Sequence, residues 1–203
     1  MHGPRTPVIG GNWKMNTNAE SSRALAEAVG EGCRSIDGVE VFVCPPFPYL
    51  RRVGGALTDA GGGVSLAAQD VWHEPDGAFT GEVSAAMLLD CGVSVVLTGH
   101  SERRHVIGEN DGLVNKKTIT ALNAGLSVVL CIGETLDQRE KGETDAVNEG
   151  QLRAGLDGVA PEQMASVIVA YEPVWAIGTG KTATPGDAQD AHAKIRGVLG
   201  DLY

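Results

Sequence analysis

Six short apolar runs alternate with longer amphipathic stretches along the chain, and this repetition constrains the fold more than any other feature. Each run is rich in Val, Ile and Leu and almost continuously apolar, which is typical of parallel β-strands covered on both faces. The runs that we expect to form strands are Val8–Trp13, Val39–Cys44, Val64–Ala68, Val93–Thr98, Leu126–Ile132 and Val167–Tyr171.

The stretches between the runs carry the end signals of helices. Thr184 precedes Pro185, so it can cap a helix that has the proline in its first turn. Gly92 and Gly125 follow two other stretches and indicate helix ends. The stretches that we expect to form helices are Ala19–Cys33, Tyr49–Leu57, Glu82–Asp90, Gly112–Asn123, Ala146–Leu156 and Ala188–Leu199.

Six strand–helix units in succession predict a parallel sheet with right-handed connections. The spacing of roughly 30 residues per unit is that of βαβ repeats. An open doubly wound sheet and a (β/α) barrel both agree with this periodicity, although a closed barrel typically has eight units and about 250 residues. No linker interrupts the 203 residues, so residues 1–203 are expected to form a single α/β domain.

The balance of charge limits the partners of the chain. Its 26 acidic and 16 basic residues give a formal net charge of −10, which argues against nucleic acids and anionic membranes because both select basic patches. No run approaches the roughly 18 apolar residues of a membrane-spanning helix, and the first residues lack the apolar segment of a signal peptide. The four cysteines are scattered, so we expect no disulfide, no metal site and a cytoplasmic location.

Active sites of parallel α/β proteins form where strands end and helices begin. Lys14 follows the first run and can supply a fixed positive charge to a phosphate or an oxyanion; the alternative is a solvated surface lysine. His100 follows the fourth run, at the start of a short helix whose partial positive charge disfavours the imidazolium form. A neutral imidazole there can donate to a carbonyl oxygen, although a structural histidine in a turn has the same pattern.

Glu172 ends the sixth run, where an apolar strand gives way to a loop. Its alternative role is to pair with a cation such as Lys181 or Arg103. The loop that follows contains a proline at its start and two glycines in its tip, which suits a lid that excludes water. A P-loop is excluded, because Trp175 occupies the position of the first required glycine.

Five segments occur in the order and spacing of the triosephosphate isomerase family, which the chain resembles over essentially its whole length. The resemblance implies a TIM-barrel-like (β/α) repeat with six of the usual eight units, in which a parallel sheet is flanked by helices. The segments are Asn12–Asn16, Gly77–Glu82, Thr98–Arg104, Cys131–Glu134 and Tyr171–Lys181.

The resemblance also implies an activity and the residues that perform it. The family interconverts dihydroxyacetone phosphate and glyceraldehyde 3-phosphate through an enediol, without a metal or an organic cofactor. By resemblance, Glu172 is the base that moves the proton, neutral His100 donates to the substrate oxygens and Lys14 stabilises negative charge there. Asn12 helps to position the substrate, and the Gly178 N–H contacts the phosphate when the lid closes.

Other residues have supporting roles by resemblance. Glu102 is similar to the family's second carboxylate near the base, and Trp175 and Cys131 belong to the matching segments around the site. Gly77–Glu82 resembles the segment that reaches into the active site of a neighbouring subunit, which implies a homodimer.

The sequence departs from the family's pattern after the helix that follows the sixth run. The Tyr-Gly-Gly-Ser segment and the later glycine pair, which in the family bind the phosphate and latch the lid, do not occur. We therefore expect the gap in the barrel to be closed by another chain or by repacked segments, in a dimer or a swapped assembly. Three functions remain open: an active isomerase, a truncated and catalytically weak or inert scaffold, and a different α/β enzyme or phosphate-binding protein.

Overall fold

The computed structural model describes residues 5–178 and 180–203. The chain forms two compact units. The first contains the chain up to Leu97 together with Asn123–Ser127, and the second contains Thr98–Leu122 and Val128–Tyr203. The expectation of one domain over residues 1–203 stays a prediction, and residues 1–4 and Thr179 lie outside the described residues.

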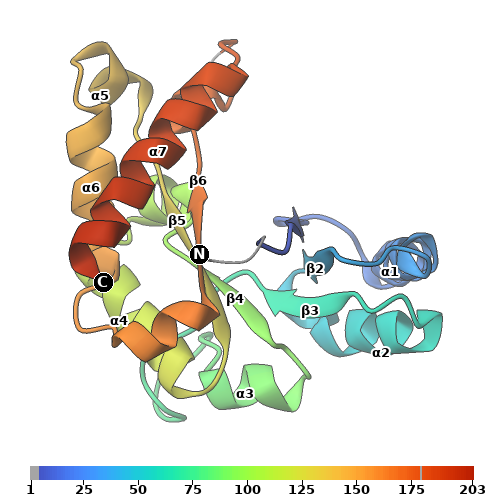
Figure 1. The fold of residues 1–203 in the computed structure, drawn as a ribbon. Coiled ribbons are helices and arrows are strands. Elements are labelled where there is room, and N and C mark those ends of the chain that lie inside the picture. Colours follow the sequence, from blue (N-terminus) through green and yellow to red (C-terminus); the bar gives the residue numbers. More distant parts are fainter. Residues whose placement is uncertain (1–4, 179) are drawn as a thin grey trace. The chain divides into compact units, whose positions relative to one another are not determined.

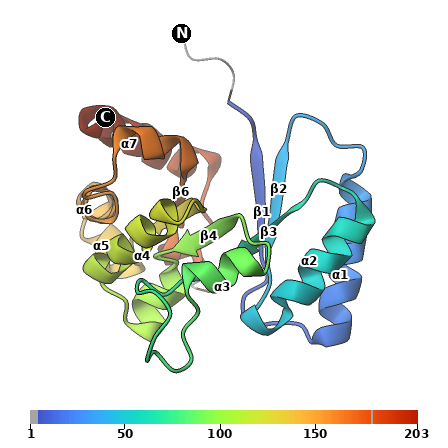
Figure 2. The same ribbon diagram turned by 90° about the horizontal axis from the view of Figure 1, so that it is seen from below.

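Parallel strands form the centre of the first unit, and each pairs with the strand that precedes or follows it in the sequence. The phenyl ring of Phe42 covers Gly10 on the neighbouring strand, where a Cβ atom would lie 2.4 Å from the ring. Figure 2 shows helices α1 and α2 together on one side of these strands. The elements are β1 (Val8–Asn12), α1 (Ala19–Cys33), β2 (Glu40–Cys44), η1 (Phe47–Tyr49), α2 (Leu50–Ala60), β3 (Ser65–Ala68), α3 (Ala85–Asp90) and β4 (Val95–Thr98).

Local chemistry sets the ends of these helices. The Asn18 side chain accepts from the backbone N–H groups of Glu20 and Ser21, so α1 begins there with a capping box. Helix α2 ends at Gly61, whose φ of 68° lies in the left-handed region that favours glycine. The two helices approach closely because Gly30 has no side chain: a Cβ there would lie 2.5 Å from that of Ala60.

The second unit is built on the parallel pair β5 and β6, in which Ile132 lies beside Tyr171. Helices α6 and α7 lie side by side along this pair (Figure 1). The elements are η2 (Arg103–Ile107), α4 (Asp111–Asn123), β5 (Ser127–Ile132), α5 (Leu136–Glu140), α6 (Thr144–Gly155), η3 (Pro161–Ser166), β6 (Val167–Tyr171), η4 (Val174–Ala176) and α7 (Pro185–Leu202).

The observed elements confirm the expected α/β class, since parallel strands alternate with helices in both units. The cap at Thr184 is also confirmed, because its side chain accepts from the Asp187 N–H at 3.2 Å. Helix α7 therefore begins at Pro185, earlier than the expected Ala188. Helix α5 was not expected, whereas the short helix expected at His100 is present and continues into the π-helical turn η2. Within the described ranges, no helix is long and apolar enough to cross a membrane.

Candidate active site

His100 and Glu172 form the centre of the site in the second unit. His100 follows β4 and Glu172 follows β6, so both side chains extend from the carboxyl ends of strands. The Nε2 atom of His100 lies 3.0 Å from Oε1 of Glu172, and their side chains are only 10% and 18% exposed. The structure thus brings a buried imidazole and a half-buried carboxylate into direct hydrogen-bond contact.

The hydrogen bonds of His100 assign its protons. Its Nδ1 atom accepts from the backbone N–H of Glu102 at 3.3 Å, at the start of the helical turn that leads into η2. A ring nitrogen that accepts an N–H carries no proton, so the proton resides on Nε2 and faces Glu172. Nε2 is thus the ring nitrogen that is placed to donate to Glu172, and His100 lies at the amino terminus of a helical turn.

Glu172 is held as a carboxylate by three donors. Besides His100, the backbone N–H of Ser101 donates to its Oε2 at 2.8 Å, and the Ser101 hydroxyl lies 3.4 Å from Oε1. Burial alone would raise the pKa of Glu172, but the hydrogen bonds from His100 and Ser101 outweigh it and hold the pKa below its ordinary value. The carboxylate is thus available to accept a proton at neutral pH.

The end of β5 positions the main chain of Glu172. The Glu172 N–H donates to the carbonyl of Ile132 at 2.8 Å. Gly133 packs so closely that a Cβ there would lie 1.8 Å from the Glu172 carbonyl oxygen. Gln151 of α6 accepts from the Gly133 N–H at 2.8 Å. The base therefore rests on a glycine that a side chain of α6 holds in place.

Trp175 anchors the loop that follows Glu172. Its side chain is buried, its Nε1 donates to the Tyr171 hydroxyl at 3.3 Å and the Arg139 guanidinium lies 4.0 Å from its ring centre. The Tyr171 hydroxyl lies 3.1 Å from both carboxylate oxygens of Glu134. Burial is the main cause that raises the pKa of Tyr171 to about 12, so its hydroxyl keeps its proton and donates to Glu134.

The tip of this loop is exposed, whereas its start at Trp175 is buried. Gly178 is exposed and has a φ of 70°, in the left-handed region. Lys181 donates to Glu140 at 2.9 Å and Arg103 pairs with Glu109 at 2.6 Å. The two cations considered as partners of Glu172 thus bind other carboxylates.

Glu102 and Cys131 border the His100–Glu172 pair. A carboxylate oxygen of Glu102 lies 3.6 Å from Nδ1 of His100, and half of the Glu102 side chain is exposed. Cys131 is buried in β5, and its carbonyl accepts from the Arg104 guanidinium at 3.3 Å. Glu102 therefore lies beside His100, and Cys131 contacts the neighbouring Arg104.

Asn12 and Lys14 lie in the first unit, where they contact each other. The Lys14 N–H donates to Oδ1 of Asn12 at 2.9 Å. Lys14 has a φ of 53°, which is rare for a residue with a side chain and stores strain. Gln69 offsets this strain by donating to the carbonyls of both Lys14 and Cys44, at 2.8 and 2.9 Å. Gln69 has no sequence signal of its own, since 55 residues separate it from Lys14.

The segment Gly77–Glu82 forms a tight turn in the first unit. Phe79 donates its N–H to the Gly77 carbonyl at 3.0 Å, and its ring packs against Trp72 with ring centres 5.6 Å apart. Phe79 is still 39% exposed, and Met15 is 96% exposed. The unit thus presents large apolar side chains to its surroundings.

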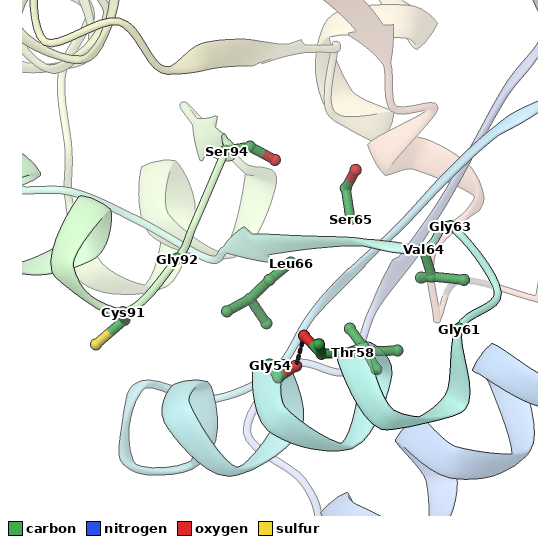
Figure 3. Close-up of a pocket in the computed structure, with 11 residues that line it drawn as sticks. Gly54, Thr58, Gly61, Gly63, Val64, Ser65, Leu66, Cys91, Gly92 and Ser94 are labelled. Atoms are coloured by element: carbon green, nitrogen blue, oxygen red, sulfur yellow. Dashed lines mark hydrogen bonds between the residues drawn. The ribbon is translucent and has the colours of Figure 1, made fainter.

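A pocket of about 480 Å³ also lies in the first unit (Figure 3). It opens at the amino-terminal ends of β3 and β4, where Ser65 and Ser94 line it beside Leu66 and Cys91. The predicted site residues follow the opposite, carboxyl ends of the strands, and none of them lines this pocket. In the part of the chain that the structure describes, no group of three or more His, Cys, Asp or Glu side chains could hold a metal ion.

Comparison with known proteins gives the same family as the motifs. The family model described as triosephosphate isomerase matches residues 7–203. A protein named triosephosphate isomerase from Symbiobacterium thermophilum is 50% identical over 98% of this chain and 77% of its own length. Proteins of that name from Citrifermentans bemidjiense and a Roseiflexus species are 53% and 48% identical, each over 98% of this chain and over 78% and 77% of their own lengths.

Proposed function

The chain belongs to the triosephosphate isomerase family, and we propose that it interconverts dihydroxyacetone phosphate and D-glyceraldehyde 3-phosphate by proton transfer through an enediol. The observation that carries the proposal is the 3.0 Å contact between Nε2 of His100 and the carboxylate of Glu172. This contact supplies a base and a neutral donor at one place, which are the two groups that enolisation next to a carbonyl requires.

Glu172 moves the proton between C1 and C2 of the triose. Its lowered pKa keeps it ionised before it accepts the proton. His100 donates from Nε2 to the substrate oxygens, and because it is neutral it can serve both oxygens as negative charge passes between them. Each such group accelerates a reaction by roughly 10²–10⁴-fold.

Asn12 and Lys14 complete the proposed machinery. Lys14 supplies positive charge to the developing enediolate, and Asn12 both positions the substrate and accepts the Lys14 N–H. The left-handed backbone of Lys14, held by Gln69, supports a fixed placement for this charge. These assignments extend the family's roles to the matching residues of this chain.

The loop after β6 acts as the lid in this proposal. Its buried start at Trp175 is a fixed anchor, whereas its exposed tip at Gly178 brings an N–H to the substrate phosphate. Closure excludes water and so protects the enediol from side reactions. Glu102 supports the pair from its place beside His100, and Cys131 supports it through its contact with Arg104.

We also propose that the two units form one (β/α) domain and that the chain assembles as a homodimer through Gly77–Glu82. Phe79 and Met15 support a protein partner, because both are large apolar side chains that this unit leaves exposed. A cytoplasmic location agrees with the four cysteines, all of them described, which form no disulfide.

A coupled isomerase assay tests the proposed function. The chain should turn over either triose phosphate, and Glu172→Gln should lower kcat by roughly 10³-fold or more, because it removes the base and leaves the shape of the site intact. Equal rates for the two proteins would refute the proposal. Binding of phosphoglycolate to Glu172→Gln, measured by calorimetry, reports separately on the phosphate site.

A further inference from the structure

We propose that Arg104 is a positioning residue, whose buried guanidinium sets the orientation of His100 toward Glu172. The proposal rests on the proposed function, because it concerns the same site. The Arg104 side chain is only 6% exposed. Its Nε donates to the Gly99 carbonyl at 2.7 Å, its Nη2 to the Cys131 carbonyl at 3.3 Å and its Nη1 to Oδ1 of Asp111 at 2.5 Å.

Arg104 holds the backbone on both sides of the His100 Cα atom. Its side chain binds the carbonyl of Gly99, which belongs to the peptide before His100. Its own backbone N–H donates to the His100 carbonyl at 3.0 Å, which belongs to the peptide after it. The His100 carbonyl also accepts from the Arg103 N–H at 2.9 Å, so the peptide before His100 is the one that the Arg104 side chain itself holds.

Gly99 packs directly against the Arg104 guanidinium. Its φ is 68°, in the left-handed region, and a Cβ there would lie 2.7 Å from Nη2 of Arg104 and 2.9 Å from Cγ1 of Val114. A glycine is thus required both by the turn and by the arginine beneath it. The turn that presents His100 is built around the guanidinium.

The same guanidinium connects the His100 turn to β5, the strand that lies beside β6 and the base. Cys131, which accepts from Nη2, immediately precedes Ile132, whose carbonyl accepts the Glu172 N–H. Arg104 therefore joins the His100 turn to the end of β5, against which Glu172 is placed. Only a planar fork can serve two carbonyls and a carboxylate at once, so lysine is no substitute.

A purely structural role and a positioning role predict different results. If Arg104 only stabilised the fold, its replacement would lower the melting temperature and leave kcat and the His100 ring unchanged. If Arg104 positions His100, its replacement changes the hydrogen bonds of the His100 ring and lowers kcat. KM then changes little, because binding of the substrate phosphate does not depend on Arg104.

The test compares Arg104→Lys with Arg103→Lys, which makes the same change one position away. The Arg103 guanidinium donates to the side chain of Glu109 at 2.6 Å, whereas the Arg104 guanidinium donates to the Gly99 carbonyl beside His100. We expect Arg104→Lys to lower kcat by about 10–100-fold with KM within about twofold, as a small misplacement of a catalytic group does. Arg103→Lys should keep kcat within about threefold.

Nitrogen-15 NMR of His100 gives a readout that needs no turnover. The wild type should show an unprotonated Nδ1 and a protonated Nε2, and Arg103→Lys should show the same pattern. Arg104→Lys should show a mixture of tautomers. If the wild type has no isomerase activity, the proposed function fails, whereas the NMR pattern still decides the role of Arg104.

A second variant covers the case in which Arg104→Lys does not fold. Asp111→Ala removes the anchor of Nη1 at a side chain that is 44% exposed, so the fold should tolerate it. We expect a smaller change of the His100 resonances in the same direction and a decrease of about 3–10-fold in kcat. An unchanged His100 pattern in every folded variant overturns the proposal.

Discussion

The ionisation of Glu172 depends on its neighbours more than on its burial. His100→Ala removes the donor at Oε1 and leaves the burial of the carboxyl largely in place. We therefore expect the pKa of Glu172 to rise in this variant, measured by NMR titration of the side-chain carboxyl carbon. Ser101→Ala is the matched control, because it removes a hydroxyl at 3.4 Å and keeps the backbone donor at 2.8 Å. A smaller rise is expected there, and a pKa that falls in His100→Ala would contradict the interpretation.

The lowered pKa also makes the stability of the chain depend on pH. In the folded state Glu172 binds a proton less readily than at its ordinary value of 4.5. Its ionisation therefore stabilises the fold fully above that value, and this contribution is lost as the pH falls through the folded pKa. Urea unfolding of the wild type and Glu172→Gln from pH 7 to 3 should show a difference in unfolding free energy that changes only below about pH 5. A difference that varies mainly between pH 6 and 7 would point to another group.

The close packing of Gly133 against Glu172 predicts that a side chain at position 133 would displace the base. A Cβ at this position would lie 1.8 Å from the Glu172 carbonyl oxygen, so Gly133→Ala must displace the main chain of Glu172. We expect a loss of about 1–3 kcal/mol in stability and of about 10²-fold in kcat. Gly150→Ala is the control, because Gly150 is exposed in α6 with no atom within 4 Å of an added Cβ. It should stabilise the chain slightly, by about 0.5–1 kcal/mol, with kcat unchanged.

At the scale of elements, the apolar runs predicted the strands well because each run is bounded by polar, glycine or proline residues. The range Val167–Tyr171 agrees with β6 at both ends. Helix α5 was missed because its five residues are too few to repeat the helical period of apolar residues, although Thr135 caps it. Helix α2 runs past the expected Leu57 to Ala60, where the left-handed Gly61 ends it.

Some residues of the site could be predicted from the sequence and others could not. His100 and Glu172 could be predicted because each follows a strand, and the structure brings them together at 3.0 Å. Gln69 and Gln151 could not be predicted, because they lie 55 and 18 residues from the backbone groups that they bind. Such contacts arise only when distant elements pack, and glutamine is common on exposed helices and loops. Sequence patterns thus find the reacting groups and miss those that hold them.

The cap of α7 gives a prediction at this scale. The Thr184 side chain accepts from the Asp187 N–H, and Asp187 in turn accepts from the Thr184 N–H at 2.8 Å. Thr184→Ala removes one half of this capping box at the carboxyl end of the loop after β6. We expect a loss of about 1 kcal/mol in unfolding free energy, measured by urea titration. Thr184→Ser, which keeps the hydroxyl, should lose much less, and equal losses in both variants would exclude the cap as the cause.

For the whole molecule, the net charge of −10 opposes the approach of an anionic substrate. Attraction must then come from local groups, which in the proposed function are Lys14 and the backbone N–H of Gly178. The same charge favours separate chains over assemblies, since like-charged copies repel each other. An assembly of this chain therefore needs apolar contacts that outweigh the repulsion.

Met15 is the side chain best suited to test the proposed homodimer, because it is 96% exposed and its replacement leaves the packing of the chain intact. The wild type should sediment at micromolar concentration with twice the mass of one chain, and Met15→Glu should shift it toward a single chain, since a carboxylate buried at an interface loses its hydration. Ile36→Glu is the control: Ile36 is also apolar and 48% exposed, it follows α1, and the proposed homodimer gives it no role. It should sediment as the wild type does. A wild type that sediments as one chain would overturn the homodimer, and equal behaviour of the two variants would move the interface away from Met15.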